Sequence, residues 1–179
     1  MLPFFAAHAS VLGGWALVKA GQPGEGLRRL CAGIDTARAM GARLLTLYSL
    51  PVLADACLAT GRVEEGLSAV REALAETEKT EVRWCEAELN RLEGELVLAA
   101  AEPEESGAEA SFRRAIALAR RQDAKSWELR AATSLARLLA RQGRREEARG
   151  LLAPVYGWFT EGFDIADLKA AKALLAELA

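Results

Sequence analysis

The sequence predicts an all-α protein, a right-handed solenoid of helical hairpins with about nine helices, and two observations carry that prediction. The first is composition: of 179 residues, 37 are Ala and 28 are Leu, whereas Val, Ile and Thr together number only 18. Strong helix formers therefore take the place of the β-branched residues that strands prefer. The second is an internal repeat, because ten identities at one constant offset relate residues 37–65 to residues 119–147. Half of that offset, roughly 40 residues, is a plausible length for one helical hairpin.

Each hairpin is predicted to hold two helices, which the apolar spacing places in order along the chain. We expect helices at residues 3–20, 24–40, 42–60, 63–79, 81–101, 106–122, 124–142, 145–160 and 164–178. Gly21, Gly61 and Gly143 follow helical stretches and are expected to end them in the left-handed conformation. Pro51 and Pro154 fall inside predicted helices, where each removes a hydrogen bond and should kink or break the helix.

A frame of small residues recurs in every hairpin and predicts where the helices approach one another. The first helices carry a small residue at Gly14, Ala54, Gly94 and Ala136. The second helices carry a small, a large and a small residue in that order, and the one exception is Val155 at the last position of the fourth hairpin. In chain order these positions are Gly26, Leu30, Gly33; Gly66, Val70, Ala73; Ala108, Phe112, Ala115; and Ala148, Leu152, Val155. Small residues let two helices come close while the large one fills the space between neighbours.

These helices divide the chain into four degenerate hairpins and a cap. The hairpins are expected at about residues 1–41, 42–80, 81–123 and 124–163, and the capping helix at 164–179. The cap is predicted to begin with Asp164 as N-cap and to keep one polar face, as the end of a solenoid requires. The first helix is instead apolar from Leu2 to Val18, which suggests that helices of a longer protein cover it.

The sequence offers little for catalysis or cofactor binding. Its only histidine is His8, and Cys31, Cys57 and Cys85 form no C-x-x-C pair, so we predict no metal and no cofactor. The odd number of cysteines indicates free thiols in a reducing, cytoplasmic compartment. No G-x-x-x-x-G-K-[ST] loop is present, and we predict that the chain is not an enzyme.

Bulk properties also argue against two classes of partner. The formal net charge is −2, whereas nucleic-acid-binding domains are strongly basic, so we expect no nucleic-acid partner. The apolar start contains His8 and Ser10, lacks a positively charged leader, and is shorter than the roughly 20 residues of a membrane span. We therefore expect no membrane partner.

Three stretches resemble the tetratricopeptide (TPR) repeat, whose hairpins are marked by a small residue, a glycine turn and an alanine. They are Leu92-Glu-Gly94, Phe112 followed by Ala115, and Gly143-Arg-Arg-Glu-Glu-Ala148. The period of roughly 40 residues is longer than that of the family, and the family's aromatic residue is missing at Leu17, Cys57, Val97 and Leu139. The resemblance covers nearly the whole chain and implies a protein-binding module.

The C-terminal half is similar to the C-terminal repeats of large bacterial signalling proteins. In that group an adenylate or guanylate cyclase domain, or a DNA-binding domain of a transcription regulator of the LuxR type, is joined to a signalling ATPase module and then to such repeats. The similar stretches are residues 108–122, 124–137 and 156–163. The resemblance implies a regulatory arm in signal transduction and no chemistry for this chain.

In TPR arrays the first helix of each hairpin lines the concave surface, and the shared frame lets equivalent positions be compared. We predict a partner-binding groove on this surface, with the following residues: His8, Trp15, Lys19, Tyr48, Asp55, Glu88, Arg91, Glu95, Arg130, Arg137 and Arg141. Offsets of seven and eleven residues keep these side chains on one helix face. Trp15 and Tyr48 are the expected aromatic anchors, and Arg130, Arg137 and Arg141 the expected contacts to carboxylates.

Two interpretations of this face remain open. Either the groove recognises a segment or domain of a partner protein, or its charges satisfy one another, with Glu88 facing Arg130 and Glu95 facing Arg137, and contribute little. A separate alternative is a homodimer. It would form through the apolar first helix or through the aromatic C-terminal end around Tyr156, Trp158 and Phe159, with no separate ligand.

Overall fold

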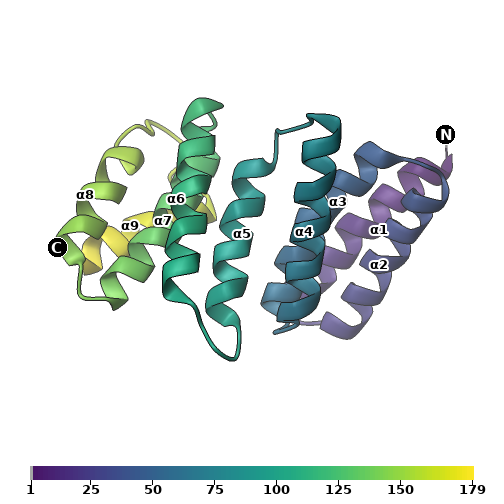
Figure 1. The fold of residues 1–179 in the computed structure, drawn as a ribbon, viewed down its shortest axis with the longest axis horizontal. Helices are drawn as coiled ribbons and strands as arrows, with labels where there is room; N and C mark the ends of the chain where they lie inside the picture. Colours follow the sequence, from purple (N-terminus) through teal and green to yellow (C-terminus); the bar gives the residue numbers. More distant parts are fainter. Residues whose placement is uncertain (1) are drawn as a thin grey trace. The chain divides into compact units, whose positions relative to one another are not determined.

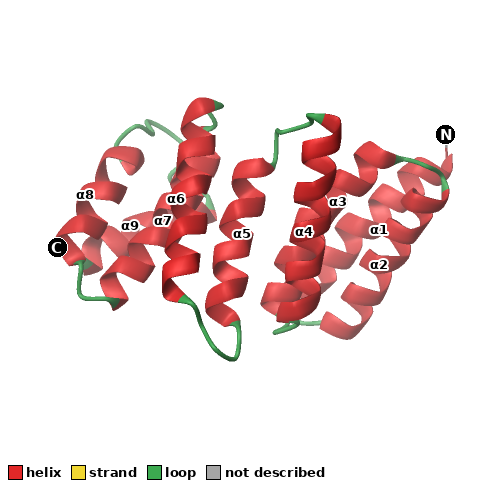
Figure 2. Cartoon of the chain, viewed as in Figure 1, coloured by secondary structure: helices red, strands yellow, loops and turns green. Residues whose placement is uncertain are grey.

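The computed structural model describes residues 2–179, and this part of the chain holds nine helices and no strand (Figure 1, Figure 2). The helices are α1 (Leu2–Lys19), α2 (Pro23–Ala39), α3 (Arg43–Ala59), α4 (Val63–Thr80), α5 (Glu86–Ala99), α6 (Glu105–Arg121), α7 (Lys125–Arg141), α8 (Arg145–Tyr156) and α9 (Ala166–Glu177). The all-α helical-hairpin architecture predicted from composition and repeat is confirmed.

The turns between helices recur at an even interval in the first half of the chain. Residues 21, 41, 61 and 81 all have a positive φ, and so do 123 and 143 in the second half. Glycine occupies four of these six positions because it adopts this conformation without steric cost, while Glu81 and Asp123 adopt it at the other two. The interval is interrupted between Glu81 and Asp123, where the longer loop between α5 and α6 lies.

The chain divides into two compact units, which are described separately. Unit 1 comprises Met1–Cys85 together with Ala99–Pro103, and unit 2 comprises Glu86–Leu98 together with Glu104–Ala179. Unit 1 therefore contains α1 to α4, and unit 2 contains nearly all of α5 and the whole of α6 to α9. Each of the predicted hairpin ranges holds two helices.

In unit 1, α1 and α2 run side by side, with small residues at the contact (Figure 1). A Cβ on Gly14 would lie 2.5 Å from the backbone nitrogen of Leu30 and 2.6 Å from the carbonyl oxygen of Gly26. The two backbones are therefore in contact, and no side chain fits between them. Leu27, Leu30 and Ile34 of α2 join Ala56 and Cys57 of α3 in one buried cluster.

In unit 2, the core lies among α6, α7, α8 and α9, with α5 packed against α6. A Cβ on Gly94 of α5 would lie 2.5 Å from the ring of Phe112, so the absent side chain makes room for that buried ring. Leu129, Leu135, Leu139 and Leu152 fill the core between the helices. Helix α9 contacts α7 and α8 and buries Leu168, Ala171 and Leu174 against them (Figure 1). Every position of the predicted small-residue frame is buried.

Two local predictions were wrong, and the two prolines behave differently from each other. Helix α5 begins at Glu86 rather than at 81, because Glu81 caps α4 in the left-handed conformation and a short non-helical segment follows it. Helix α9 starts after Ile165, in extended conformation, so Asp164 is not its N-cap. Pro51 does not break α3, which continues to Ala59, whereas α8 ends two residues after Pro154.

Candidate partner-binding site

The predicted groove residues lie on the first helices of the hairpins, α1 and α3 in unit 1 and α5 and α7 in unit 2. The structure brings them together within each unit as three groups: a polar cluster around Asp55, an aromatic stack around Tyr48, and a charged cluster around Arg91. Arg137 and Arg141 lie beyond these groups, on the last two turns of α7.

The polar cluster in unit 1 links α1 to α3. The indole Nε1 of Trp15 donates a hydrogen bond of 2.7 Å to Oδ2 of Asp55, and Nζ of Lys19 lies 2.7 Å from the same oxygen. The Lys19 ammonium also lies 5.5 Å from the centre of the Trp15 ring, within the range of a cation–π interaction. These three side chains satisfy one another, and Trp15 remains 37% exposed.

The aromatic stack, also in unit 1, contains a residue that the sequence pattern did not assign to the groove. Tyr48 lies between His8, at 5.4 Å between ring centres, and Trp84, at 5.7 Å with nearly parallel planes. Trp84 is exposed, and Nδ1 of His8 is buried with no hydrogen-bond partner among the described residues. Trp84 precedes α5 in a non-helical segment, so no helical periodicity could assign it to this face.

The charged cluster in unit 2 is buried and internally paired. Nη2 of Arg91 donates to Oε1 of Glu88 at 2.8 Å, and Nη1 donates to Oε1 of Glu95 at 3.3 Å. Glu88 and Arg91 are only 5% and 7% exposed. The predicted pair of Glu88 with Arg130 is confirmed, with 3.0 Å between Oε1 and Nη1. A buried ion pair of this kind is costly to break because one charge would remain without a partner.

Arg137 and Arg141 differ from the other predicted groove residues of unit 2. Both are exposed, and neither forms an ion pair or side-chain hydrogen bond within the described part of the chain. The predicted pair of Glu95 with Arg137 does not form, because Glu95 accepts hydrogen bonds from Arg91 and from Ser134, the latter at 2.6 Å. On this face, therefore, Glu88, Arg91, Glu95 and Arg130 are paired with one another. Arg137 and Arg141 are not part of these pairs.

A pocket of about 290 Å³ in unit 2 contains both of these arginines. It is lined by residues of α5, α7 and α9, namely Glu95, Leu98, Ser134, Arg137, Ala140, Arg141, Leu174 and Glu177. Two guanidinium groups beside apolar side chains can bind a carboxylate that carries an apolar neighbour. The two acidic residues of the lining keep the pocket from being uniformly basic.

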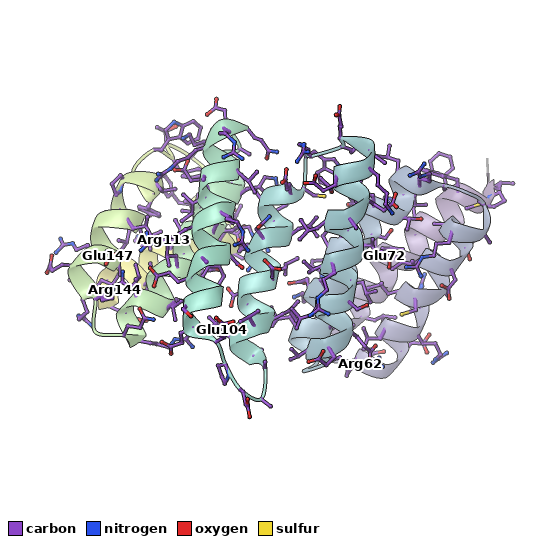
Figure 3. The ribbon with its side chains drawn as sticks, in the orientation of Figure 1. Arg62, Glu72, Glu104, Arg113, Arg144 and Glu147 are labelled. Atoms are coloured by element: carbon purple, nitrogen blue, oxygen red, sulfur yellow. The ribbon has the colours of Figure 1, made fainter. Side chains whose placement is uncertain are left out.

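A second charged network in unit 2 joins α6 and α8, and it involves no predicted groove residue. Arg113 and Arg144 each pair with both Glu109 and Glu147, at 2.6 to 2.9 Å, and Figure 3 shows Arg113, Arg144 and Glu147 at these helices. Hydrogen bonds from Arg144 and Arg113 lower the pKa of the Glu109 carboxyl, and those from Arg113 and Arg144 lower the pKa of Glu147. Because its charges are mutually paired, this network has a structural role.

The aromatic C-terminal end is more exposed than a packing role between repeats would require. Trp158 is 58% exposed, its ring contacts Phe159 edge-on, and Nζ of Lys125 lies 5.8 Å from its centre. The ring of Trp158 is therefore not buried between helices. Tyr156 contacts Phe163 at 6.0 Å between ring centres.

The described residues hold neither a metal-ligand cluster nor a membrane-spanning helix. Between residues 2 and 179, no group of three or more His, Cys, Asp or Glu side chains is arranged to hold a metal ion. None of the helices in that range has the length and apolar character needed to cross a membrane. Burial raises the pKa of the Cys57 thiol to about 11, so this side chain is a neutral thiol at physiological pH.

Comparison with solved structures identifies the fold as that of TPR-like repeat proteins. The nearly identical TPR-like repeats assigned to a kinesin light chain of Podosopora anserina match 97% of this chain and 86% of their own, with a TM-score of 0.71 and 18% identity. A glutamine-to-methionine variant of the same repeats matches 99% of this chain and 86% of its own, with a TM-score of 0.73 and 18% identity. No protein-family model and no curated protein matches the sequence. At this identity the likeness concerns the fold, and by its fold the chain is a TPR-like helical-hairpin protein.

Proposed function

We propose that this chain is a protein-interaction module that binds an acidic segment of a partner protein on the first-helix face of unit 2. In this proposal Arg137 and Arg141 contact a carboxylate of the segment. The single observation that carries the proposal is that these two exposed arginines share a pocket and have no partner in the described chain, whereas their neighbours Glu88, Arg91, Glu95 and Arg130 are paired.

The pocket supports this proposal in two ways. Arginine presents a planar set of donors that matches the two oxygens of a carboxylate, and the pairing is stronger where apolar neighbours reduce solvent access. Leu98 and Leu174 supply such neighbours in the lining. Ser134 is already engaged as a donor to Glu95, so the two arginines are the open donors of this surface.

The aromatic stack of unit 1 is proposed as a second contact surface. Trp84 presents an exposed ring that rests on Tyr48, and Tyr48 in turn rests on His8. Exposed tryptophans on a fixed support are frequent anchors in protein interfaces. Trp15 and Lys19 belong to the same helix face and are held by Asp55.

The setting of this module is also a proposal. Residues 108–122 and 124–137, which carry the similarity to bacterial multidomain signalling proteins, form most of α6 and α7, and α7 carries the proposed carboxylate contacts. We infer that the module is a regulatory arm in such a cytoplasmic protein, without catalytic activity of its own. The partner would then be a peptide, another protein or another domain of the same parent chain.

The test is a selection of random dodecapeptides on the immobilised chain, followed by affinity measurement by fluorescence anisotropy. We expect enrichment of peptides that contain Asp or Glu beside an apolar residue. The double substitution Arg137→Glu and Arg141→Glu should weaken their binding at least about tenfold, since each lost charge-assisted hydrogen bond contributes about 1.5 to 3 kcal/mol.

A matched control carries the same change of charge elsewhere in unit 2. Arg121→Glu and Arg149→Glu replace two exposed arginines on the second helices α6 and α8, and should leave peptide affinity unchanged. Circular dichroism of both variants would verify that they are folded. Equal affinity of the selected peptides for the Arg137/Arg141 variant and the native chain would contradict the proposal, as would a selection that yields no peptide above background.

A further inference from the structure

The outer face of α1 carries an exposed apolar stripe. Leu2, Phe5 and Leu12 are 86%, 59% and 38% exposed, and Ala9 and Ala16 are exposed between and beyond them. These five residues follow one another at alternating intervals of three and four, the spacing that keeps side chains on one face of a helix and forms the seam between two packed helices. We call them the α1 seam.

The equivalent positions of the next first helix in unit 1 are covered. Adding 40 to Phe5, Ala9 and Ala16 gives Leu45, Ser49 and Ala56 of α3, which are 4%, 0% and 0% exposed. Leu45 packs against Ala7 and Ala37, and Ala56 packs in the cluster formed by residues of α1 and α2. On α3, therefore, the face that corresponds to the α1 seam packs against the preceding pair of helices, α1 and α2.

The same holds in unit 2. The positions of α7 that match Ser49 and Ala56 in the repeat are Ala131 and Leu138, which are 1% and 0% exposed. Both lie in the core cluster with residues of α6 and α8. An exposed apolar face favours association with another apolar surface.

The chemistry of the seam matches a second copy of itself. Helix α1 has no Asp, Glu, Lys or Arg before Lys19, so no charge of α1 itself opposes the approach of two copies along the seam. In an antiparallel pair with its twofold axis at Ala9, residue i lies opposite residue 18 − i. Leu2 then faces Ala16, and Phe5 faces Gly13, so each large residue meets a small one.

Gly13 has a charged neighbour that is compatible with this pairing. A Cβ on Gly13 would lie 3.0 Å from Cζ of Arg29, so the guanidinium of α2 lies against the edge of the seam. In the antiparallel pair the ring of Phe5 from the second copy reaches this edge. A guanidinium beside an aromatic ring is a favourable contact.

We propose that the α1 seam is the contact of a symmetric homodimer, with α1 of a second copy as its occupant. The contact is isologous, because the same residues of both copies take part. It involves neither the arginine pocket nor the aromatic stack, and so stands independently of the peptide-binding function.

The size of the seam predicts a weak dimer. The five seam residues present about 400 Å² of apolar surface per copy. Two copies would bury about 800 Å², below the size of most stable specific interfaces, where complexes are weak and reversible. We therefore expect a dissociation constant in the micromolar range, within the concentrations of the test below.

The first test is the solution mass of the 179-residue chain by light scattering, from about 1 to about 300 µM. The mass should rise from one chain towards two and level off. Leu12→Glu should hold the chain at the mass of one copy over this range, since it would place a charge in the seam of each copy. Leu44→Glu makes the same replacement at an exposed leucine of α3 and should leave the dimer intact.

The second test keeps the proposal falsifiable if Leu12→Glu perturbs folding. Ala9→Cys in a Cys31→Ala background places two thiols at the proposed twofold axis, and mild oxidation should give a covalent dimer. Ala59→Cys, at an exposed position of α3, should give little.

Three results would overturn the proposal. The first is a mass of one chain at every concentration. The second is a dimer that survives Leu12→Glu, or one that is lost on Trp158→Glu instead, which would assign the contact to the aromatic C-terminal end. The third is a mass that rises without levelling off, because that indicates an open head-to-tail assembly.

Discussion

The hairpin of α1 with α2 and that of α5 with α6 use a glycine at the same place in the repeat for opposite purposes. Gly14 lets two backbones touch, because the nearest atoms to its missing Cβ are the Leu30 nitrogen and the Gly26 oxygen. Gly94 leaves a space that the ring of Phe112 fills. The other two hairpins have Ala54 and Ala136 at this position, and both are fully buried.

This difference shows what the repeat conserves within the chain. The first-helix position stays small in all four hairpins, while the large residue of the second helix varies, as Leu30, Val70, Phe112 and Leu152 show. In the first hairpin the backbone of the large residue, Leu30, lies against the glycine. In the third hairpin the ring of the large residue, Phe112, lies against the glycine. The two hairpins should therefore respond differently to substitution.

The largest expected effect is the loss of the Phe112 ring. Phe112→Ala removes a fully buried ring that nothing else can replace, and should lower the free energy of unfolding by about 3 to 5 kcal/mol. Urea unfolding followed by circular dichroism would measure it. Phe163→Ala removes an exposed ring and should cost less than about 1 kcal/mol; equal losses for the two variants would contradict the assignment of Phe112 to the core.

A smaller loss of stability is expected from substitution of Gly14 or Gly94, and it should depend on different neighbours at the two positions. Gly14→Ala and Gly94→Ala should each cost about 1 to 3 kcal/mol through overpacking, despite the better helix propensity of alanine. The cost at Gly94 should shrink in the double variant Gly94→Ala with Phe112→Leu, because a flexible side chain replaces the ring that clashes. The cost at Gly14 should not shrink with Leu30→Ala, since its clash is with backbone atoms.

The double-mutant comparison also tells which result would contradict this view. Rescue of Gly14→Ala by Leu30→Ala, or absence of any coupling between positions 94 and 112, would mean that the two contacts do not differ as described.

The smallest expected effect concerns acid sensitivity. Burial raises the pKa of Glu128, but hydrogen bonds from Arg120 at 2.7 Å and Lys125 at 2.9 Å outweigh it, and the net result is a pKa below 4.5. A lowered pKa in the folded state means that the contribution to stability is fully present above about pH 4.5 and is lost as the pH falls through the folded value.

The direction of the Glu128 pKa shift can be tested with the substitution Glu128→Gln. The difference in unfolding free energy between the native chain and this variant should be present at pH 7 and shrink below pH 4.5. Glu146→Gln changes a glutamate of α8 that makes no ion pair within the described residues, and should show no such narrowing. A constant difference for Glu128→Gln down to pH 3 would contradict the role given to its two donors.

Much of the fold could be predicted because helical propensity and the repeat agree with each other. The glycine turns at 21, 61 and 143 and the buried frame from Gly14 to Val155 follow from local pattern, and both are confirmed. The start of α5 could not be predicted, since Glu81 takes the left-handed conformation that the pattern assigns to glycine. Pro51 does not break α3, which is continuous across it, with Leu50 and Pro51 both buried.

The candidate site was less predictable than the fold. The frame brought Glu88 and Arg130 together correctly, because both lie at the same position of adjacent first helices. It could not tell that Ser134 and Arg91 satisfy Glu95 and leave Arg137 without a carboxylate, since that choice depends on side-chain conformations. Trp84 was not assigned to this face because it lies outside any helix.

The central claim, that the first-helix face of unit 2 leaves only Arg137 and Arg141 open to a carboxylate, can be tested by NMR. A short acetylated peptide with an Asp-Leu sequence would be titrated into the chain while the side-chain Nε–H signals of the arginines are followed. We expect the signals of Arg137 and Arg141 to shift together and saturate, and those of Arg91, Arg121 and Arg149 to stay in place. Unchanged signals for Arg137 and Arg141, or equal shifts at Arg121 and Arg149, would contradict the claim.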